Sequence, residues 1–184
     1  MRRVRYRVAA SLDGYIAGPA GEIDWIVPDS SVDFGALYAE FDTVLLGRQT
    51  YKLTLQPGAP PWPAGWRIYV VSRTLPAQQP AGVTVVRSAD DTVTALRAES
   101  GRDIWLFGGG VLAASLLEAG LLDQVEVSVM PVLLGGGPRL VAVGAPRTPL
   151  KLAKSRSSPS GILDLEYEVQ RAAVQQTPTL TRGV

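Results

Sequence analysis

The sequence of 184 residues contains no cysteine and no histidine. Without cysteine, the chain has no disulfide, no thiolate metal site and no cysteine nucleophile. Without histidine, it lacks the commonest general base and metal ligand, which excludes serine–histidine hydrolysis and the usual zinc chemistry. No carboxylate loop of the D-x-D-x-D-G type is present either, so we expect no metal site. These absences favour a reaction whose difficult step is carried out by an organic cofactor.

An excess of charge of one sign and long hydrophobic runs are also missing. Lysine and arginine number 18 against 17 aspartate and glutamate, so we expect neither nucleic acid nor an anionic membrane as a partner. No apolar run approaches the roughly 18 residues of a membrane span, and the N-terminus lacks the apolar core of a signal peptide. We therefore expect one cytoplasmic domain over residues 1–170 and a flexible polar tail over 171–184.

The order of the expected elements indicates an α/β fold. Residues 4–11 alternate as a strand does, and Arg2, Arg3, Arg5 and Arg7 are expected to form its solvent-facing side. Further strands are expected at 43–47, 67–72, 83–86, 103–107 and 124–135, a final hairpin at 150–170, and helices at 32–41, 90–100 and 111–120. Because strand–helix units come first and adjacent strands last, we expect a three-layer fold. Its central sheet is mostly parallel with an antiparallel C-terminal edge, and helices lie on both faces.

Two loops have an unusual composition. Residues 57–66 contain four prolines and two tryptophans and cannot form a helix. This loop either covers a small aromatic substrate or is a rigid connector. The run Gly135-Gly136-Gly137 follows an expected strand, and we interpret it as a turn or bulge.

Three motifs at the ends of expected strands suit a phosphate-bearing ligand. Gly108-Gly109-Gly110 joins a strand to a helix whose N-terminal N–H groups and dipole favour an anion. The motif comes too late in the chain for a Rossmann domain, but it fits a phosphate-binding turn of another α/β fold. Gly47-Arg48-Gln49-Thr50 supplies a guanidinium and a hydroxyl. Ser72-Arg73-Thr74 suits a ribose 2′-phosphate, and so NADPH. Each motif taken alone is equally consistent with an ordinary polar turn.

The order of these motifs resembles the dihydrofolate-reductase-like superfamily. The likeness is closer to stand-alone relatives of the C-terminal reductase domain of riboflavin-biosynthesis proteins. The matching segments are SLDGYIAGPAGEIDWI (11–26), VLLGRQTY (44–51), YVVSRT (69–74) and LFGGGVLAASLLEAGLLDQVEVSVMPVLLGGG (106–137). The resemblance implies an NADPH-dependent reductase acting on a pterin, an aminouracil such as 5-amino-6-(5-phosphoribosylamino)uracil, or a related small heterocycle. Relatives often form homodimers and often have a cis peptide within the first glycine run.

The resemblance also implies which residues bind the cofactor. Ala9 and Ile16 would border the nicotinamide, Ser72 and Arg73 would hold the 2′-phosphate, and the remaining residues would surround the other phosphates. The full cofactor-binding set is Ala9, Ile16, Gly47, Arg48, Thr50, Ser72, Arg73, Thr74, Gly108, Gly109, Gly110 and Val111.

The substrate side is less sharply defined. Asp33, on the first helix, is the positional candidate for the carboxylate that anchors the ring and assists protonation in dihydrofolate reductases. Asp24 and Glu22, in the loop that would close over the site, are the alternative catalytic candidates, and Asp13 and Trp25 are expected to bind substrate.

One position departs from the pattern of the riboflavin-pathway reductases. Those proteins usually carry a glutamate just before the glycine run, where this sequence has Phe107. A non-catalytic NADP-binding protein of the same fold therefore remains the alternative prediction.

Overall fold

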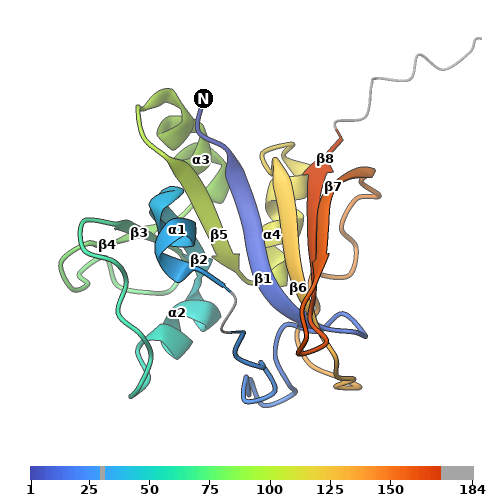
Figure 1. Cartoon of the computed structure of the whole chain (residues 1–184). Helices are drawn as coiled ribbons and strands as arrows, with labels where there is room; N and C mark the ends of the chain where they lie inside the picture. The colour runs from blue at the N-terminus through green and yellow to red at the C-terminus, as the bar shows by residue number, and fades with distance from the viewer. Residues whose placement is uncertain (30–31, 171–184) are drawn as a thin grey trace, which may run out of the picture.

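The sheet has the predicted mixture of parallel and antiparallel strands. A computed structural model of the chain describes residues 1–29 and 32–170, so the tail expected over 171–184 lies outside the described residues. The strands are β1 (Val4–Ser11), β2 (Phe41–Gly47), β3 (Arg67–Val71), β4 (Val83–Val86), β5 (Asp103–Gly108), β6 (Gln124–Met130), β7 (Leu150–Ser157) and β8 (Leu163–Val169). Their order is β4-β3-β2-β5-β1-β6-β8-β7 (Figure 1). All neighbouring pairs from β4 to β6 are parallel, whereas β8 and β7 are antiparallel to their neighbours.

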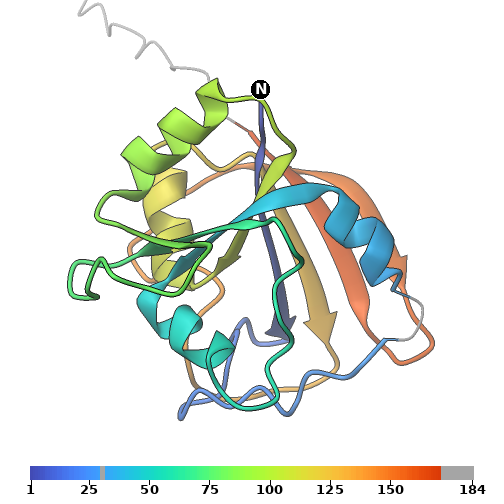
Figure 2. The same cartoon turned by 90° about the vertical axis from the view of Figure 1, so that its left-hand side faces the viewer.

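Helices cover both faces of this sheet, as predicted. They are α1 (Phe34–Ala39), α2 (Arg48–Thr54), α3 (Ala89–Ala98) and α4 (Gly110–Glu118). Figure 2 shows α3 and α4 against one face and α1 across the sheet from them. No helix in the described part of the chain is long and apolar enough to cross a bilayer.

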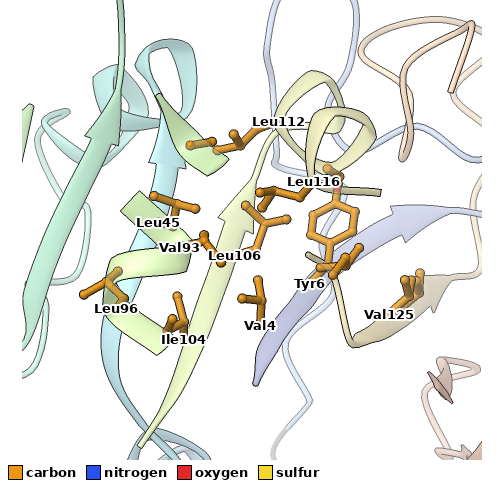
Figure 3. Close-up of a cluster of buried hydrophobic side chains, with 14 of the residues drawn as sticks. Val4, Tyr6, Leu45, Val93, Leu96, Ile104, Leu106, Leu112, Leu116 and Val125 are labelled. Atoms are coloured by element: carbon orange, nitrogen blue, oxygen red, sulfur yellow. The ribbon is translucent and has the colours of Figure 1, made fainter. Parts of the chain in front are cut away.

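The alternation along each strand divides the core into two layers. Leu45 belongs to the cluster formed with α3 and α4, whereas its neighbours Val44 and Leu46 belong to the cluster formed with α1 and α2. Figure 3 shows the first cluster, in which side chains of β1, β2 and β5 meet those of α3 and α4. The second cluster is rich in aromatic rings, and Trp66 and Trp62 bring the proline–tryptophan loop into it. The helices on each face therefore pack on the sheet through a separate apolar cluster.

The bounds of two elements differ most from the predicted ones. The first helix begins at Phe34, because Asp33 is its N-cap and accepts a hydrogen bond from the Ala36 N–H at 3.0 Å. The helix also ends before Phe41, which is the first residue of β2. Strand β6 stops at Met130, earlier than predicted, because the next residue is Pro131, which has no N–H to donate.

The prediction that the arginines at the start of the chain face solvent is wrong for Arg2 and Arg5, whereas Arg3 is exposed. Arg5 is only 6% exposed and Arg2 only 3%. Arg5 and Arg7 both donate to Glu126 of β6, which is itself 2% exposed. Burial alone would lower the pKa of Arg5, but its hydrogen bonds to Glu126 and Glu40 raise it above the ordinary value. Arg5 and Arg7 do share one face of the strand, but that face is covered by other residues and its arginines are ion-paired.

The glycine run Gly135–Gly137 is a bend, in agreement with its interpretation as a turn. Gly137 has φ +123° and approaches the 17–18 backbone so closely that a Cβ there would lie 2.1 Å from the Ala17 carbonyl oxygen. This run therefore fastens the segment after β6 to the loop after β1.

Candidate functional site

The three glycine, arginine and serine motifs meet at one edge of the sheet. In the parallel register, Leu46 lies opposite Gly108 and Gly47 lies opposite Val71. The motifs that follow β3, β2 and β5 therefore emerge side by side, at the carboxyl ends where open α/β sheets bind ligands. Strand β1 is the other neighbour of β5 and brings Ala9 to the same edge.

A single large cleft runs along this edge. Its volume is about 2100 Å³, whereas a pocket for one drug-sized ligand is usually about 300–1,000 Å³. All twelve predicted cofactor-binding residues line it: Ala9, Ile16, Gly47, Arg48, Thr50, Ser72, Arg73, Thr74, Gly108, Gly109, Gly110 and Val111. The cleft has room for a dinucleotide together with a second small molecule.

The first glycine run lies at the centre of the cleft. A Cβ on Gly109 would be 3.7 Å from both the Ile16 Cδ1 and the Thr50 Oγ1, so the loop after β1 and helix α2 both reach this turn. Gly109 is also the N-cap of α4, and no side chain caps that helix. The peptide bond between Gly108 and Gly109 is cis, as the resemblance implies. An anion at this turn would find uncapped N–H groups and the positive end of the α4 dipole.

The turn after β3 is shaped by Ser72. Its hydroxyl oxygen accepts hydrogen bonds from the Thr74 N–H at 3.2 Å and the Leu75 N–H at 3.0 Å. Arg87, which follows β4, donates to the carbonyl oxygens of Ser72 and Leu75. Arg87 lines the cleft and was not predicted, since its role depends on the pairing of β4 with β3. These bonds fix the backbone that carries Arg73.

The two predicted phosphate-binding arginines are available to a ligand. Arg48 and Arg73 are exposed and have no carboxylate within salt-bridge distance among residues 1–29 and 32–170. This distinguishes them from Arg2, Arg5 and Arg7, which are held in ion pairs. An anionic ligand in the cleft would therefore meet two guanidinium groups whose charge is not already balanced by a carboxylate.

The predicted substrate-side carboxylates do not line the main cleft. Glu22 accepts a hydrogen bond from the Ala20 N–H at 2.8 Å, and Asp24 lies exposed in the same loop. Asp33 caps α1 and lines a small polar cavity of about 200 Å³ next to the cleft. Trp25 donates its indole N–H to the Glu22 carbonyl oxygen at 3.0 Å and also lies outside the cleft lining. The loop after β1 does line the cleft, but through other side chains, such as Ile23 and Ile26.

Asp13 holds two loops together and does not line the cleft. Its carboxylate accepts the Ser11 hydroxyl at 2.6 Å and the backbone N–H groups of Leu134 at 3.1 Å and Gly135 at 2.7 Å. These bonds, the Ser11 hydroxyl above all, lower the pKa of Asp13 from 3.8 to about 2. The charged form is thus the one that the folded state favours.

Replacing Asp13 with asparagine is expected to lower stability at neutral pH, because the loop N–H groups lose a charged acceptor. A carboxyl group whose pKa is lower in the folded state stabilises the fold above its unfolded pKa and loses that effect as pH falls through the folded pKa. The stability difference between wild type and Asp13→Asn should therefore shrink from about pH 4 to about pH 2. Urea unfolding at a series of pH values measures it. A difference that stays constant over this range would contradict the lowered pKa.

The end of the cleft beside the proline–tryptophan loop is mainly apolar and aromatic. The ring centroids of Trp62 and Phe107 lie 5.0 Å apart, edge to face, and Trp105 lies 5.3 Å from Phe107. All three line the cleft, so the proline–tryptophan loop forms part of its wall. The sequence does not indicate that Trp105 belongs to the site, because a tryptophan inside a strand is usually part of the hydrophobic core. The other apolar lining residues at this end include Val32, Phe34, Leu37, Tyr38, Met130 and Ile162.

Three polar residues of this end were not predicted: Arg7, Ser128 and Asp164. Ser128 lies opposite Ala9 across β1 and β6, and Asp164 lies opposite Ser128 across β6 and β8. The Ser128 hydroxyl donates to the Asp164 Oδ1 at 2.6 Å. Each of these residues alternates with apolar neighbours, so only the strand pairing brings them to the cleft.

The sheet order and the helices on both faces define a dihydrofolate-reductase-like α/β fold. Dihydrofolate reductase from Enterococcus faecalis, complexed with NADP(H), matches with a TM-score of 0.68 at 18% identity, over 92% of this chain and 97% of that one. At this identity, the match concerns the fold alone.

Within that class the family is clear. The chain belongs to the RibD C-terminal domain family, whose model matches residues 2–163. The uncharacterized protein YyaP of Bacillus subtilis (strain 168) is 30% identical over 177 residues, which covers 90% of this chain and 94% of YyaP. A solved structure from Shewanella sp. PV-4, whose name connects it with riboflavin biosynthesis, matches with a TM-score of 0.78 at 29% identity, over 93% of this chain and all of that one. Family membership supports a reductase-type function.

Proposed function

We propose that this protein is an NADPH-dependent reductase that transfers hydride to a C=N or C=O bond of a small heterocyclic substrate. One observation carries the proposal: all twelve residues expected to hold the cofactor, from separate parts of the chain, line one cleft. The cleft continues into an aromatic end, where a flat ring can stack beside Trp62 and Phe107. The coarser conclusion, a reductase-type protein, already follows from the family.

The residues of the cleft fit a dinucleotide that carries a pyrophosphate and a 2′-phosphate. The run Gly108–Gly110 offers backbone without side chains beside the uncapped end of α4, which suits the pyrophosphate. Arg73 and the fixed turn around it suit the 2′-phosphate, and Arg48 and Thr50 suit the remaining phosphate oxygens. Bound NADPH would supply the hydride. The protein would bind and orient the two molecules and exclude water from the aromatic end.

The proton donor is a separate question within this proposal. Of the three carboxylates expected to act in catalysis, Asp33 is retained as a candidate because it lines the polar cavity beside the cleft. Asp24 and Glu22 line neither space, so a catalytic role for either needs a different conformation of their loop.

Two further properties belong to the same proposal. We propose a cytoplasmic protein, and a homodimer formed through the sheet edge at β7. Leu150 and Leu152 of that edge strand are 44% and 51% exposed, and Leu163 of β8 is 40% exposed. An uncovered edge strand that carries exposed leucines is usually protected by a partner.

Thermal unfolding with each cofactor, followed by a turnover assay, tests the proposed function. NADPH at 100 times its dissociation constant is expected to stabilise the fold by about 2.7 kcal/mol, and NADH at the same concentration by much less. Loss of nicotinamide absorbance with a panel of pterins and aminouracils then measures reduction. Tight NADPH binding without reduction of any compound in the panel would favour the alternative, a non-catalytic NADP-binding protein. That alternative is kept because Phe107 stands where the riboflavin-pathway reductases usually have a glutamate. Equal stabilisation by both cofactors would contradict the 2′-phosphate assignment.

A further inference from the structure

The substrate end of the cleft contains a polar row that spans four strands. The strand registers place Ala9 opposite Ser128, Ser128 opposite Asp164, and Asp164 opposite Arg156 of β7. Paired residues in a sheet share one face, so these four side chains form a line across it. Ala9, Ser128 and Asp164 all line the main cleft. The row begins where the nicotinamide is expected and leads to a carboxylate.

Asp164 is held in a fixed orientation by its two neighbours in the row. Its Oδ1 accepts the Ser128 hydroxyl at 2.6 Å, and its Oδ2 accepts an Arg156 N–H at 2.6 Å. Each carboxylate oxygen has a second lone pair, so the group keeps acceptor capacity for a ligand. One of the two donors is a cation and the other is a hydroxyl group. Asp164 is therefore suited to accept hydrogen bonds from a ligand.

Only two other carboxylates line the main cleft, within the described residues, and neither is placed as Asp164 is. Asp90 follows β4 on the cofactor side, in the first turn of α3. Asp29 lies in the loop after β1, 3.4 Å from the same Arg156. Asp164 is the one that projects from the sheet beside Ala9 and Ser128, on a rigid strand.

The charge around this end disfavours a phosphate on the substrate. The small polar cavity beside the cleft shares Arg7, Ser128 and Asp164 with it. Its charged lining residues are Arg7, Lys154 and Arg156, against Asp33, Glu40, Glu126, Asp164 and Glu166. Each of the three cations already has a carboxylate partner, in Glu126, Glu166 and Asp164 respectively. A phosphate in this small cavity would meet an excess of negative charge, and no cation that lines the cavity is without a carboxylate partner.

We propose that Asp164, held by Ser128 and Arg156, is the residue that anchors the substrate, and that the substrate is an unphosphorylated flat heterocycle with amino or ring N–H donors. This inference rests on the proposed reductase function, which it deepens by naming the substrate class. The ring would lie between the aromatic wall and the nicotinamide position, with its N–H edge toward Asp164. The anchoring carboxylate would then come from strand β8, and not from the first helix or the loop after β1.

Binding of two matched pteridines tests the anchor. 2,4-Diaminopteridine presents amino donors, whereas 1,3-dimethylpteridine-2,4-dione presents carbonyl oxygens at the same positions and has no amino or ring N–H donor. Titration calorimetry, with and without saturating NADPH, is expected to show that wild type prefers the diamino ring. Asp164→Asn should weaken its binding by roughly 10-fold or more, since a hydrogen bond to a charged group contributes about 1.5–3 kcal/mol, while leaving the dione nearly unchanged. Ser128→Ala should weaken the diamino ring less, because the carboxylate remains.

The control variant is Glu168→Gln. Glu168 lies on the same strand, is paired with Lys151 at 3.7 Å and does not line the cleft or the small cavity. It should bind both rings as wild type does. Equal affinity of wild type and Asp164→Asn for the diamino ring would overturn the anchor, as would an equal loss for both rings. Displacement of the bound ring by ribose 5-phosphate would overturn the exclusion of phosphate.

These outcomes are separate from those of the proposed function. Failure of NADPH to bind the wild-type protein would contradict the cofactor assignment. The titrations of the two rings without cofactor would still test whether Asp164 anchors the substrate. Asp164→Asn removes the charge that pairs with Arg156, so the melting temperature of each variant is measured beside its affinity. If Asp164→Asn does not fold, the preference between the two rings in Ser128→Ala decides the anchor, and an undiminished preference there counts against it.

Discussion

Replacing Arg73 with alanine is expected to lower the affinity for NADPH by roughly 10- to 100-fold, because a hydrogen-bonded charge pair contributes about 1.5–3 kcal/mol. Arg73 is exposed, lines the cleft and has no carboxylate partner among the described residues. Its backbone is held by the bonds of Ser72 and Arg87, so the substitution removes the guanidinium without loosening the turn. Affinity for NADH, which lacks the 2′-phosphate, should change little.

Fluorescence titration of both cofactors measures this change in preference. Arg147→Ala is the matched control, because Arg147 is exposed and lies outside the cleft lining, so its loss removes one positive charge from the molecule without touching the site. If NADPH and NADH lost affinity equally in Arg73→Ala, the guanidinium would be contacting a phosphate that both cofactors share. Arg48→Ala is expected to give that second pattern.

Replacing Glu126 with alanine should lower the free energy of unfolding by about 3–5 kcal/mol, the usual cost of leaving a buried charge without its partner. Glu126 is 2% exposed and accepts from the Arg5 Nε at 2.5 Å, the Arg5 Nη2 at 3.0 Å and the Arg7 Nη1 at 2.7 Å. Neither arginine can lose its proton at accessible pH, so the positive charge would stay in place after Glu126 is removed. Arg5 would keep its pair with Glu40, which is half exposed and at the rim.

Denaturant unfolding of Glu126→Ala, Glu126→Gln and Glu168→Ala separates the causes. Glu126→Gln keeps the shape and one acceptor oxygen, so it should lose less than the alanine variant. Glu168→Ala removes a half-exposed carboxylate from the same sheet face and should change stability by no more than about 1 kcal/mol. Comparable losses in Glu126→Ala and Glu168→Ala would mean that the buried network is no more important than a surface pair.

The meeting of the expected cofactor-binding residues at one edge of the sheet could be predicted because their signals are local. A glycine run between a strand and a helix, or an arginine directly after a strand, has the same meaning wherever the strand lies in the sheet. The prediction that Arg48, Arg73 and Gly109 share a groove needed only that their strands be parallel and neighbouring, and β3, β2 and β5 are both.

The expected substrate-side residues could not be placed in the same way. Glu22 and Asp24 were expected in a loop that closes over the site and Asp33 on the first helix, yet Glu22 and Asp33 accept hydrogen bonds from nearby backbone N–H groups. Such short-range bonds are the common use of aspartate and glutamate at turns and helix starts. Asp164 gave no signal, since an aspartate in an alternating terminal hairpin is usually exposed.

The sequence by itself determined which chemistry is closed to this protein and the order of its strands and helices. The absence of cysteine and histidine excludes their chemistry whatever the structure is. The period-two alternation shows which residues of β1 share a face. Only the tertiary structure decided what covers that face. Arg5 meets Glu126 across 121 residues of chain, and Asp164 reaches the cleft because β8 pairs with β6 and β6 with β1. Local patterns fix the direction of a side chain, whereas its partner depends on which distant strand lies beside it.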